Sequence, residues 1–275
     1  MTAEQPQQRD IPEPIKRLVR QRCGFGCVIC GLPLYEYEHM EEWAIVKRHV
    51  AEEITLLCDR HHREKTGKLL PIEEVKSNND NPFNLREGVT PPYSLHFRGD
   101  FAEIVIGSNT IKTGDLQRGI AALVIDGTVL IGFHFEDGHV LLNMLLLDEN
   151  NICIMQIVKN QLVFSIDPWD VQLIGTTLTI RSAAREILVE IIFSPPNKVI
   201  INRGRILFNG IEMLIKPTHI FILNNSFTLS GALISESNYG MMLGEPFKPG
   251  AFVIKKIRRY GIDRKAALAE EKKGF

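Results

Sequence analysis

The chain lacks any long apolar run and any leader-like start. Its most apolar stretch, residues 140–147, is far shorter than the ~20 apolar residues that a membrane-spanning helix needs. The first ten residues, MTAEQPQQRD, are polar and contain no apolar core of the kind that defines a secretory signal. We therefore expect a cytoplasmic protein that has no membrane partner.

An excess of charge of either sign is also missing. Lys and Arg together number 32, Asp and Glu number 33, and the formal net charge is -1. Such a chain has no overall attraction to nucleic acid, so any binding of this kind would depend on a local basic patch. With 275 residues, of which 44% are apolar and 24% charged, the chain has the composition of a globular protein with one large or two smaller domains.

Cysteine is scarce, and its distribution is uneven. The chain has five cysteines, and four of them lie within the first 58 residues. An odd number of cysteines without a secretory signal argues against a disulfide framework and favours metal binding. Cys153 stands apart from the others, and we expect it to be a core residue.

The clustered cysteines form the two halves of a zinc-site pattern. The motif CVIC at 27–30 is followed by CDRH at 58–61, and two such pairs build a tetrahedral, structural zinc site. Because so short a segment buries little apolar surface, bound Zn²⁺ would supply much of its folding free energy. Cys23 is a rival ligand whose spacing fits less well, and we expect it to pack against a helix. The expected zinc ligands are Cys27, Cys30, Cys58 and His61.

The residues around this pattern predict short, mixed elements. Residues 11–23 have the apolar spacing of an amphipathic helix, and residues 59–66 fit a second helix. Residues 35–40 and 54–57 are expected to form two paired strands. These elements predict a small α+β domain over residues 1–76.

The rest of the chain predicts a second domain of a different kind. Residues 77–92, SNNDNPFNLREGVTPP, are rich in Asn, Pro and Gly, which indicates a linker. Short apolar, β-branched segments then alternate with Gly, Asn and Asp, so residues 93–254 are expected to be all-β. The frequent Asn turns favour a β-solenoid, with a sandwich or a barrel as alternatives. Residues 255–275 form a basic C-terminal tail.

Three further residues lie beside the zinc pattern and are not needed for it. Glu38 and His39 fall between its two halves, and His62 directly follows the second half. With them, the stretches CGFGCVICGLPLYEYEHM and EEITLLCDRHHREKTGK within residues 23–68 resemble the HNH endonuclease family. That family combines a zinc knuckle, an acidic residue and His on a strand, an Asn before a Leu-rich strand, and Cys-x-x-Cys-His on a helix.

The resemblance covers about the first quarter of the chain and implies a ββα fold that grips one divalent cation. His39 would then be the general base that takes a proton from the attacking water. Glu38 and His62 would hold the catalytic cation, Mg²⁺ or another divalent ion, which is distinct from the structural zinc. The roles of His61 and His62 are interchangeable at this point, because His62 is also a helical neighbour of Cys58.

Two positions depart from the family pattern. His61 replaces a cysteine, and His ligates zinc equally well. Glu53 aligns with the family's Asn, which is thought to brace the loop that carries the base. An ionised Glu only accepts hydrogen bonds and does not copy an amide donor. As a candidate catalytic residue, Glu53 therefore has three open roles: a different brace, an extra carboxylate near the metal, or the mark of an impaired enzyme.

Basic residues near the second ligand pair suggest contacts with nucleic acid. Arg60, Arg63 and Lys65 share the expected second helix, and such side chains position phosphates without reading bases. Interspersed glutamates leave open the alternative of an ordinary solvated face. The pattern therefore predicts nucleic acid, with DNA preferred, as the partner.

Two functions remain open after these observations. The first is a metal-dependent HNH endonuclease, a hydrolase of phosphodiester bonds, whose β domain serves association or sensing. The second is a zinc-stabilised nucleic-acid-binding or assembly protein whose catalytic site has decayed. Exposed strand edges in the β domain would favour a homo-oligomer in either case.

Overall fold

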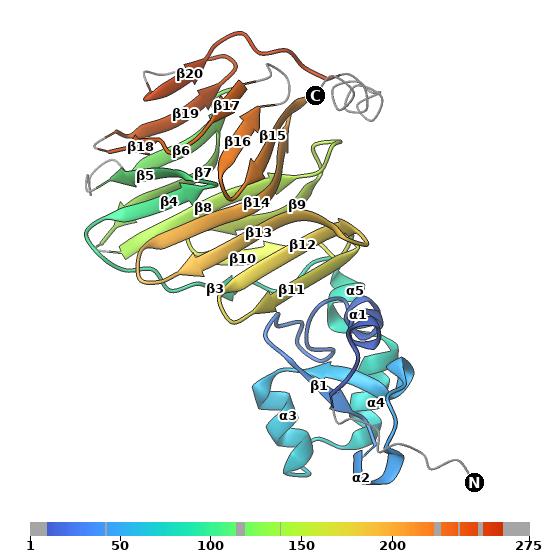
Figure 1. Cartoon of the computed structure of the whole chain (residues 1–275). Coiled ribbons are helices and arrows are strands. Elements are labelled where there is room, and N and C mark those ends of the chain that lie inside the picture. Colours follow the sequence, from blue (N-terminus) through green and yellow to red (C-terminus); the bar gives the residue numbers. More distant parts are fainter. Residues whose placement is uncertain are drawn as a thin grey trace. The chain divides into compact units, whose positions relative to one another are not determined.

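A computed structural model of the chain divides into two units, each of which is described by itself (Figure 1). Unit 1 comprises Met1–Tyr93, Val163–Gly175 and Ile180–Glu186, and unit 2 comprises Ser94–Leu162, Thr176–Thr179 and Ile187–Phe275. The basic tail expected at 255–275 lies largely outside the described residues. The structure describes residues 10–41, 43–113, 119–137, 139–222, 227–235, 237–246 and 250–260.

Unit 1 contains the helices and the strand pair that the sequence predicts near its N-terminus. β1 pairs antiparallel with β2, so that Glu36 faces Leu57 and His39 faces Ile54. Every residue of β2 is buried, as a Leu- and Ile-rich strand at the centre of a small core should be. The elements are α1 (Glu13–Arg22), β1 (Glu36–His39), α2 (Trp43–Val46), the 3₁₀ helix η1 (Ala51–Glu53), β2 (Ile54–Leu57), α3 (Asp59–Thr66), α4 (Ile72–Asp80), α5 (Phe83–Glu87) and β11 (Asp170–Ile174).

Residues 77–92, which we expected to be a linker, belong to unit 1. α4 continues to Asp80, and α5 follows after Pro82, at the position before a helix where proline is readily accommodated. The amide of Asn84 is fully buried and donates hydrogen bonds to the carbonyl oxygens of Gly24, at 2.8 Å, and Gly31, at 3.1 Å. The polar composition of this stretch therefore reflects side chains that satisfy the backbone of the cysteine-rich turn, and the first domain extends beyond residue 76.

A buried ion pair explains why a late segment of the chain, Val163–Gly175, belongs to unit 1. Arg20 on α1 and Asp170 on β11 are both almost completely buried, with side chains 1% exposed. Two hydrogen bonds of 2.8 Å join the guanidinium to the two carboxylate oxygens, and a third, of 2.7 Å, reaches the hydroxyl of Tyr37. Such a bidentate pair fixes the orientation of both partners.

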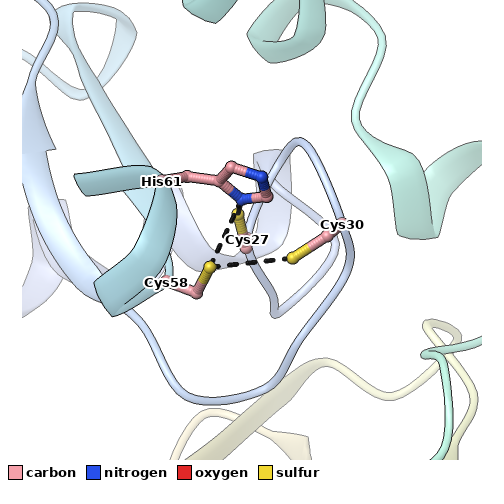
Figure 2. Close-up of side chains that lie close together, drawn as sticks. All are labelled: Cys27, Cys30, Cys58 and His61. Atoms are coloured by element: carbon pink, nitrogen blue, oxygen red, sulfur yellow. Dashed lines mark hydrogen bonds between the residues drawn. The ribbon is translucent and has the colours of Figure 1, made fainter. Parts of the chain in front are cut away.

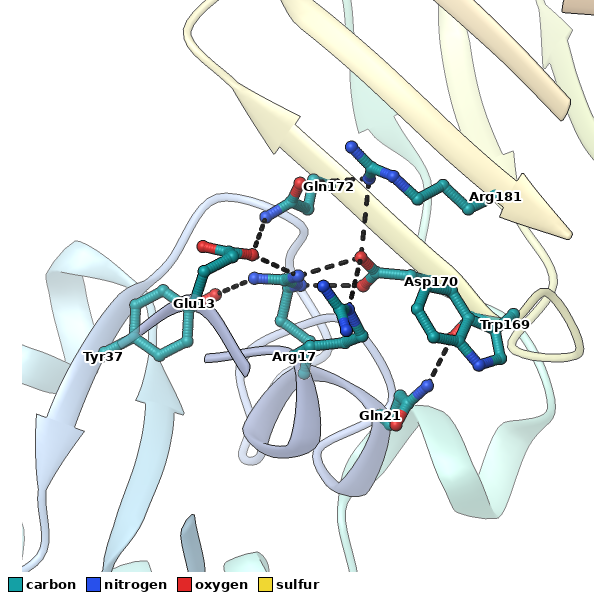
Figure 3. A network of polar contacts seen from close by, with 9 residues as sticks. Glu13, Arg17, Gln21, Tyr37, Trp169, Asp170, Gln172 and Arg181 are labelled. Carbon is teal, nitrogen blue, oxygen red and sulfur yellow. Dashed lines mark hydrogen bonds and ion pairs between the residues drawn. The ribbon is translucent and has the colours of Figure 1, made fainter. Parts of the chain in front are cut away.

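Neighbouring contacts strengthen the attachment of the late segment (Figure 3). The guanidinium of Arg17 lies over the Trp169 ring, 4.6 Å from its centroid, and Gln21 donates to the Trp169 carbonyl oxygen at 2.7 Å. Near the start of the segment, the Phe164 carbonyl oxygen accepts a hydrogen bond of 3.0 Å from the amide of Thr90. Unit 1 is therefore assembled from residues separated by about half of the chain.

Unit 2 consists of strands, in agreement with the all-β expectation for this part of the chain. Its alternating burial, as in β8, is the pattern of sheets that bury one face. Strands with residues in unit 2 are β3 (Tyr93–Ser94), β4 (Ala102–Ile106), β5 (Asn109–Thr113), β6 (Ile120–Ile125), β7 (Thr128–Glu136), β8 (His139–Leu147), β9 (Cys153–Val158), β10 (Gln161–Phe164), β12 (Thr177–Ala183), β13 (Glu186–Ser194), β14 (Lys198–Phe208), β15 (Ile211–Lys216), β16 (His219–Ile222), β17 (Phe227–Leu229), β18 (Leu233–Ile234), β19 (Tyr239–Leu243) and β20 (Phe252–Ile254).

Most neighbouring strands of unit 2 pair antiparallel. This holds from β6 to β9 and again from β13 to β17. Parallel pairs join β4 to β14, β5 to β18, and β19 to both β6 and β20. The described strands thus form open sheets built largely from meanders, and this pairing does not confirm the preference for a solenoid.

Cys153 differs from its expected place in the core. It is the first residue of β9, and its side chain is exposed. By simple alternation Cys153 would share a face with the buried Met155 and Ile157, but the pairing of β9 with β8 is irregular between Leu146 and Leu147, next to Cys153. Separately, none of the helices in the described ranges combines the length and the hydropathy of a membrane span.

The Arg20–Asp170 pair leads to a stability prediction. Asp170→Asn leaves the buried guanidinium with the exposed Glu13 carboxylate as its remaining counter-charge, and breaking a buried pair typically costs about 3–5 kcal/mol. Both tryptophans of the chain, Trp43 and Trp169, lie in unit 1, so their fluorescence during urea unfolding reports on this unit. We expect the fluorescence transition of Asp170→Asn to move to a clearly lower urea concentration.

The matched control is Lys76→Ala, which removes an exposed ion pair of 2.6 Å with Glu41 in the same unit. We expect its transition to coincide with that of the wild type, because exposed pairs contribute little to stability. An Asp170→Asn transition at the wild-type urea concentration would show that the buried pair does not hold unit 1 together.

Candidate metal centre and the adjoining polar site

The first half of the candidate zinc site is a tight turn between α1 and β1. The amide of Gly31 donates to the Cys27 carbonyl oxygen at 2.7 Å, and the amide of Val28 donates to the Leu56 carbonyl oxygen at 3.0 Å. Gly31 has a φ of +75°, and a Cβ at this position would collide with the Asn84 side chain. The turn therefore presents its two thiols from a backbone that is fixed against β2.

The second half of the site lies at the start of α3. Cys58 immediately precedes the helix and His61 occupies its first turn, so the two side chains lie on the same side. The Nδ1 atom of His61 is 3.3 Å from the sulfur of Cys58 and 3.3 Å from that of Cys27 (Figure 2). Cys58 and His61, at the start of α3, thus lie next to the turn that carries Cys27.

The resulting donor set suits a zinc ion. The ligand atoms of Cys27, Cys30, Cys58 and His61 all lie within 4.8 Å of one another. The sulfurs of Cys30 and Cys58 are 3.7 Å apart. Zn–S bonds of about 2.3 Å in a tetrahedron imply a sulfur–sulfur separation of about 3.8 Å, so the spacing fits without rearrangement. Three thiols and one imidazole can therefore hold a metal ion such as zinc, as the sequence pattern predicts.

The thiols of this cluster influence one another's protonation. A hydrogen bond from Cys30 lowers the pKa of the Cys27 thiol to about 4, and the same contact raises the pKa of Cys30 above its ordinary value. Burial is the main cause that raises the pKa of Cys58. One negative charge is thus already favoured at the centre of the cluster, where a cation would be attracted.

His62 points away from this cluster, which separates the two histidines that the sequence left interchangeable. Its Nε2 atom lies 3.1 Å from a carboxylate oxygen of Glu38, and its Nδ1 atom lies 3.5 Å from Glu36. Glu36 and Glu38 are two residues apart on β1 and therefore share a face of the strand. The structure thus places His61 with the thiols, and it brings His62 together with Glu38 on β1.

Lys65 also lies in this polar site, although we expected it to contact phosphates from the helix surface. Its ammonium group is 2.5 Å from Glu38 Oε1 and donates to the His39 carbonyl oxygen at 3.0 Å. Its side chain is only 14% exposed. Lys65 lies three residues after His62, so both side chains extend from one side of α3 towards β1.

His39 is directed to different neighbours than Glu38, because successive side chains of a strand point to opposite faces. Its Nε2 atom is 3.3 Å from the Nδ1 atom of His49, and its ring lies 4.9 Å from that of Trp43. Burial, followed by the nearby His49, lowers the pKa of His39 below its usual value. The imidazole is therefore mainly neutral at pH 7, which is the form that accepts a proton.

His49 and Trp43 were missed in the sequence, because they lie in residues 41–51, between the two stretches that carry the family resemblance. The sequence shows only that an indole and an imidazole follow His39, and their spacing matches no metal-site or catalytic pattern. Their contacts with His39 depend on how the chain between β1 and β2 folds.

Glu53 is held by an arginine. Its carboxylate accepts a hydrogen bond of 3.0 Å from Arg48 Nε and pairs with the same guanidinium through a second contact. This bonding lowers the pKa of Glu53, which is therefore ionised. The backbone oxygen of Glu53 accepts a hydrogen bond of 2.9 Å from the Met40 amide. The carboxylate thus links Glu53 to Arg48 within the chain between β1 and β2.

The other two basic residues of α3 remain on its surface. Arg60 and Arg63 are both 77% exposed and pair along the helix with Glu64, at 2.8 Å, and Asp59, at 3.1 Å. Exposed i,i+4 pairs of this kind are weak and exchange readily with other partners. Both side chains are therefore accessible to a phosphate, although neither lies in the polar site.

A second cation would find fewer donors than the first. Within the described residues, the thiol–imidazole cluster is the only group of three or more Cys, His, Asp or Glu side chains that could hold a metal ion. Glu38 and His62 supply two ligand atoms on facing elements, and water would have to complete the coordination of a Mg²⁺ ion there.

Comparisons with known proteins add no family to these observations. No protein-family model matches the chain. No curated protein and no solved structure matches it either. The resemblance to HNH endonucleases therefore rests on residues 23–68 alone.

The zinc cluster leads to a metal-content prediction. We expect the purified chain to contain one zinc ion per molecule by mass spectrometry of the metal. Cys58→Ser should lose the ion and shift the unfolding transition of unit 1 downward, because the metal supplies folding free energy. Cys23→Ala is the matched control, since Cys23 is equally buried and lies in the same segment but outside the cluster. Equal zinc contents in the two variants would contradict the assignment.

The same cluster predicts how zinc binding depends on pH. Zinc binds thiolates, so protons compete with the ion and its affinity falls as the pH falls. The lowered pKa of Cys27 favours binding above about pH 4 at that one ligand, while the raised values of Cys30 and Cys58 mean that binding releases their protons. We expect acidification to transfer zinc to a chromogenic chelator. A zinc content that is independent of pH over the acid range would be inconsistent with thiolate ligands.

Proposed function

We propose that unit 1 is a metal-dependent HNH-type endonuclease that hydrolyses phosphodiester bonds in nucleic acid, with DNA as the preferred substrate. The observation that carries this proposal is the 3.1 Å contact between Glu38 and His62, which face each other from β1 and α3 beside the zinc cluster. A purely structural zinc module has no need of a carboxylate and an imidazole at this place. The resemblance to the HNH family gives both residues a common purpose.

In this proposal, each polar residue has a distinct task. Glu38 and His62 would hold Mg²⁺ or another divalent cation, which when bound would stabilise negative charge on the phosphate. His39, kept mainly neutral by its surroundings, would accept the proton of the attacking water. Lys65 would add a fixed positive charge close to Glu38, and the zinc ion would hold α3 in place without taking part in the reaction.

A second function is favoured by a specific observation. Both oxygens of Glu38 already have partners, Lys65 and His62, and the Glu53 carboxylate is paired with Arg48. A site whose carboxylates are satisfied in this way could serve only to bind. The alternative is therefore a zinc-stabilised nucleic-acid-binding or assembly protein that has lost catalysis.

For the remainder of the protein, we propose a supporting role. Unit 2 would provide association, including a homo-oligomer, or sensing, while unit 1 acts on nucleic acid. A cytoplasmic location is part of the same proposal, because intracellular nucleic acid is the expected substrate.

Plasmid nicking tests the proposed activity. The full-length chain, freed of loosely bound cations but still containing its structural zinc, is mixed with supercoiled plasmid and Mg²⁺ or Mn²⁺. We expect nicking by the wild type and a loss of about 10²-fold or more for His39→Ala, the effect of removing a general base. Glu38→Ala should lose activity and require higher cation concentrations.

Lys76→Ala serves as the control, because its exposed side chain lies on α4 and pairs with Glu41 rather than with the polar site. Zinc content and the unfolding transition are measured for each variant, so that loss of the fold is recognised. Nicking at the same rate by the wild type and His39→Ala would reject the catalytic role of His39. DNA binding by a folded, zinc-loaded wild type that nicks with neither cation would support the alternative function.

A further inference from the structure

The chain between β1 and β2 places a second imidazole against the candidate base. His49 Nδ1 lies 3.3 Å from His39 Nε2, within the range of a weak hydrogen bond between ring nitrogens. The two residues are ten positions apart in the sequence. The family resemblance did not include His49, so its position requires an explanation of its own.

Trp43 restricts the orientation of His49. The two rings are stacked, with centroids 4.6 Å apart and an interplanar angle of 17°. The same indole also lies 4.9 Å from His39, at 54°. Stacking of this kind stabilises aromatic pairs beyond the effect of their buried area. Three rings thus form a connected cluster, in which Trp43 supports both imidazoles.

Adjacent contacts hold the backbone on which His49 lies. Arg48, the preceding residue, is paired with Glu53, and the Met40 amide donates to the Glu53 backbone oxygen at 2.9 Å. Contacts of Glu53 therefore hold the chain between β1 and β2, and the rings of both His49 and Trp43 contact the candidate base.

We propose that His49 is a positioning residue for His39, which it orients through the Nδ1–Nε2 contact with the support of Trp43. This inference rests on the proposed function, in which His39 accepts a proton. In the proposed tautomer, His39 Nε2 carries the hydrogen and donates it to His49 Nδ1, and the lone pair is then on His39 Nδ1, where it can receive the proton of water. A base whose tautomer is set by its neighbour is ready to react without rearrangement.

Two substitutions of His49 separate hydrogen bonding from side-chain volume. In His49→Asn, the amide places its oxygen at the position of Nδ1, so it can still accept the hydrogen of His39 Nε2. In His49→Gln, the amide lies one carbon farther along the side chain and does not reproduce this position. Both variants lose the ring that stacks on Trp43, which makes them a matched pair.

The direct test is the tautomer of His39, observed in the full-length, zinc-loaded protein by ¹⁵N NMR of its imidazole nitrogens at fixed pH without added divalent cation. We expect a single Nε2–H tautomer in the wild type and in His49→Asn, and a mixture in His49→Gln. The same tautomer in all three proteins, or Nδ1–H in the wild type, would overturn the proposal. This result does not depend on whether the protein cuts DNA.

Kinetics provide the second readout. We expect His49→Gln to lower kcat for nicking by about 10- to 100-fold with little change in KM, as is usual when the partner that orients an active imidazole is lost. His49→Asn should recover most of this loss. Equal kcat values for His49→Gln and the wild type would overturn the positioning role, whereas absence of nicking in the wild type would reject the proposed function and leave the tautomer experiment to decide on His49.

Discussion

The convergence of three thiols and one imidazole is the interaction on which the rest of unit 1 depends. It joins a turn that follows α1 to the start of α3, a helix whose one buried residue is His61. Once α3 is fixed by Cys58 and His61, the geometry of a helix directs His62 and Lys65 towards β1. The polar site is therefore a consequence of the metal site, because a different orientation of α3 would separate His62 from Glu38.

A second constraint holds this small unit together from outside its own stretch of sequence. The buried pair of Arg20 and Asp170 requires β11, more than a hundred residues later, to lie against α1. Burying two charges is costly unless they satisfy each other, and here the guanidinium is bonded in both directions, to the carboxylate and to Tyr37. The ion pair thus adds a second link between segments of unit 1, beside the thiol–imidazole cluster.

The sequence predicts the features of this molecule that depend on local chemistry. The spacing of the cysteines predicts the ligand cluster except for the choice between His61 and His62, and apolar spacing predicts α1. The same reasoning failed at residues 77–92, because Asn84 was judged by its polarity, whereas its amide serves buried carbonyl groups of the cysteine-rich turn. Cys153 was judged by residue type, although it lies at the start of its strand, next to an irregularity in the strand pairing, and is exposed.

Contacts between distant residues were beyond the reach of the sequence. Nothing in the order of residues indicates that Asp170 meets Arg20, or that His49 and Trp43 fold back onto His39. We expected Lys65 to contact phosphate because basic side chains on helices are commonly exposed. In the structure its ammonium group pairs with the Glu38 carboxylate in the polar site. Pairing among the many similar strands of unit 2 was likewise undetermined, since short apolar segments fit antiparallel and parallel partners equally well.

X-ray absorption at the zinc edge of the purified full-length chain tests the central interaction most directly. The account predicts a first shell of three sulfur atoms at about 2.3 Å and one nitrogen atom at about 2.0–2.1 Å. A shell of four sulfur atoms would mean that Cys23 replaces His61 and that α3 is oriented differently. A shell of nitrogen and oxygen alone would contradict the thiol cluster, and with it the placement of every residue in the adjoining polar site.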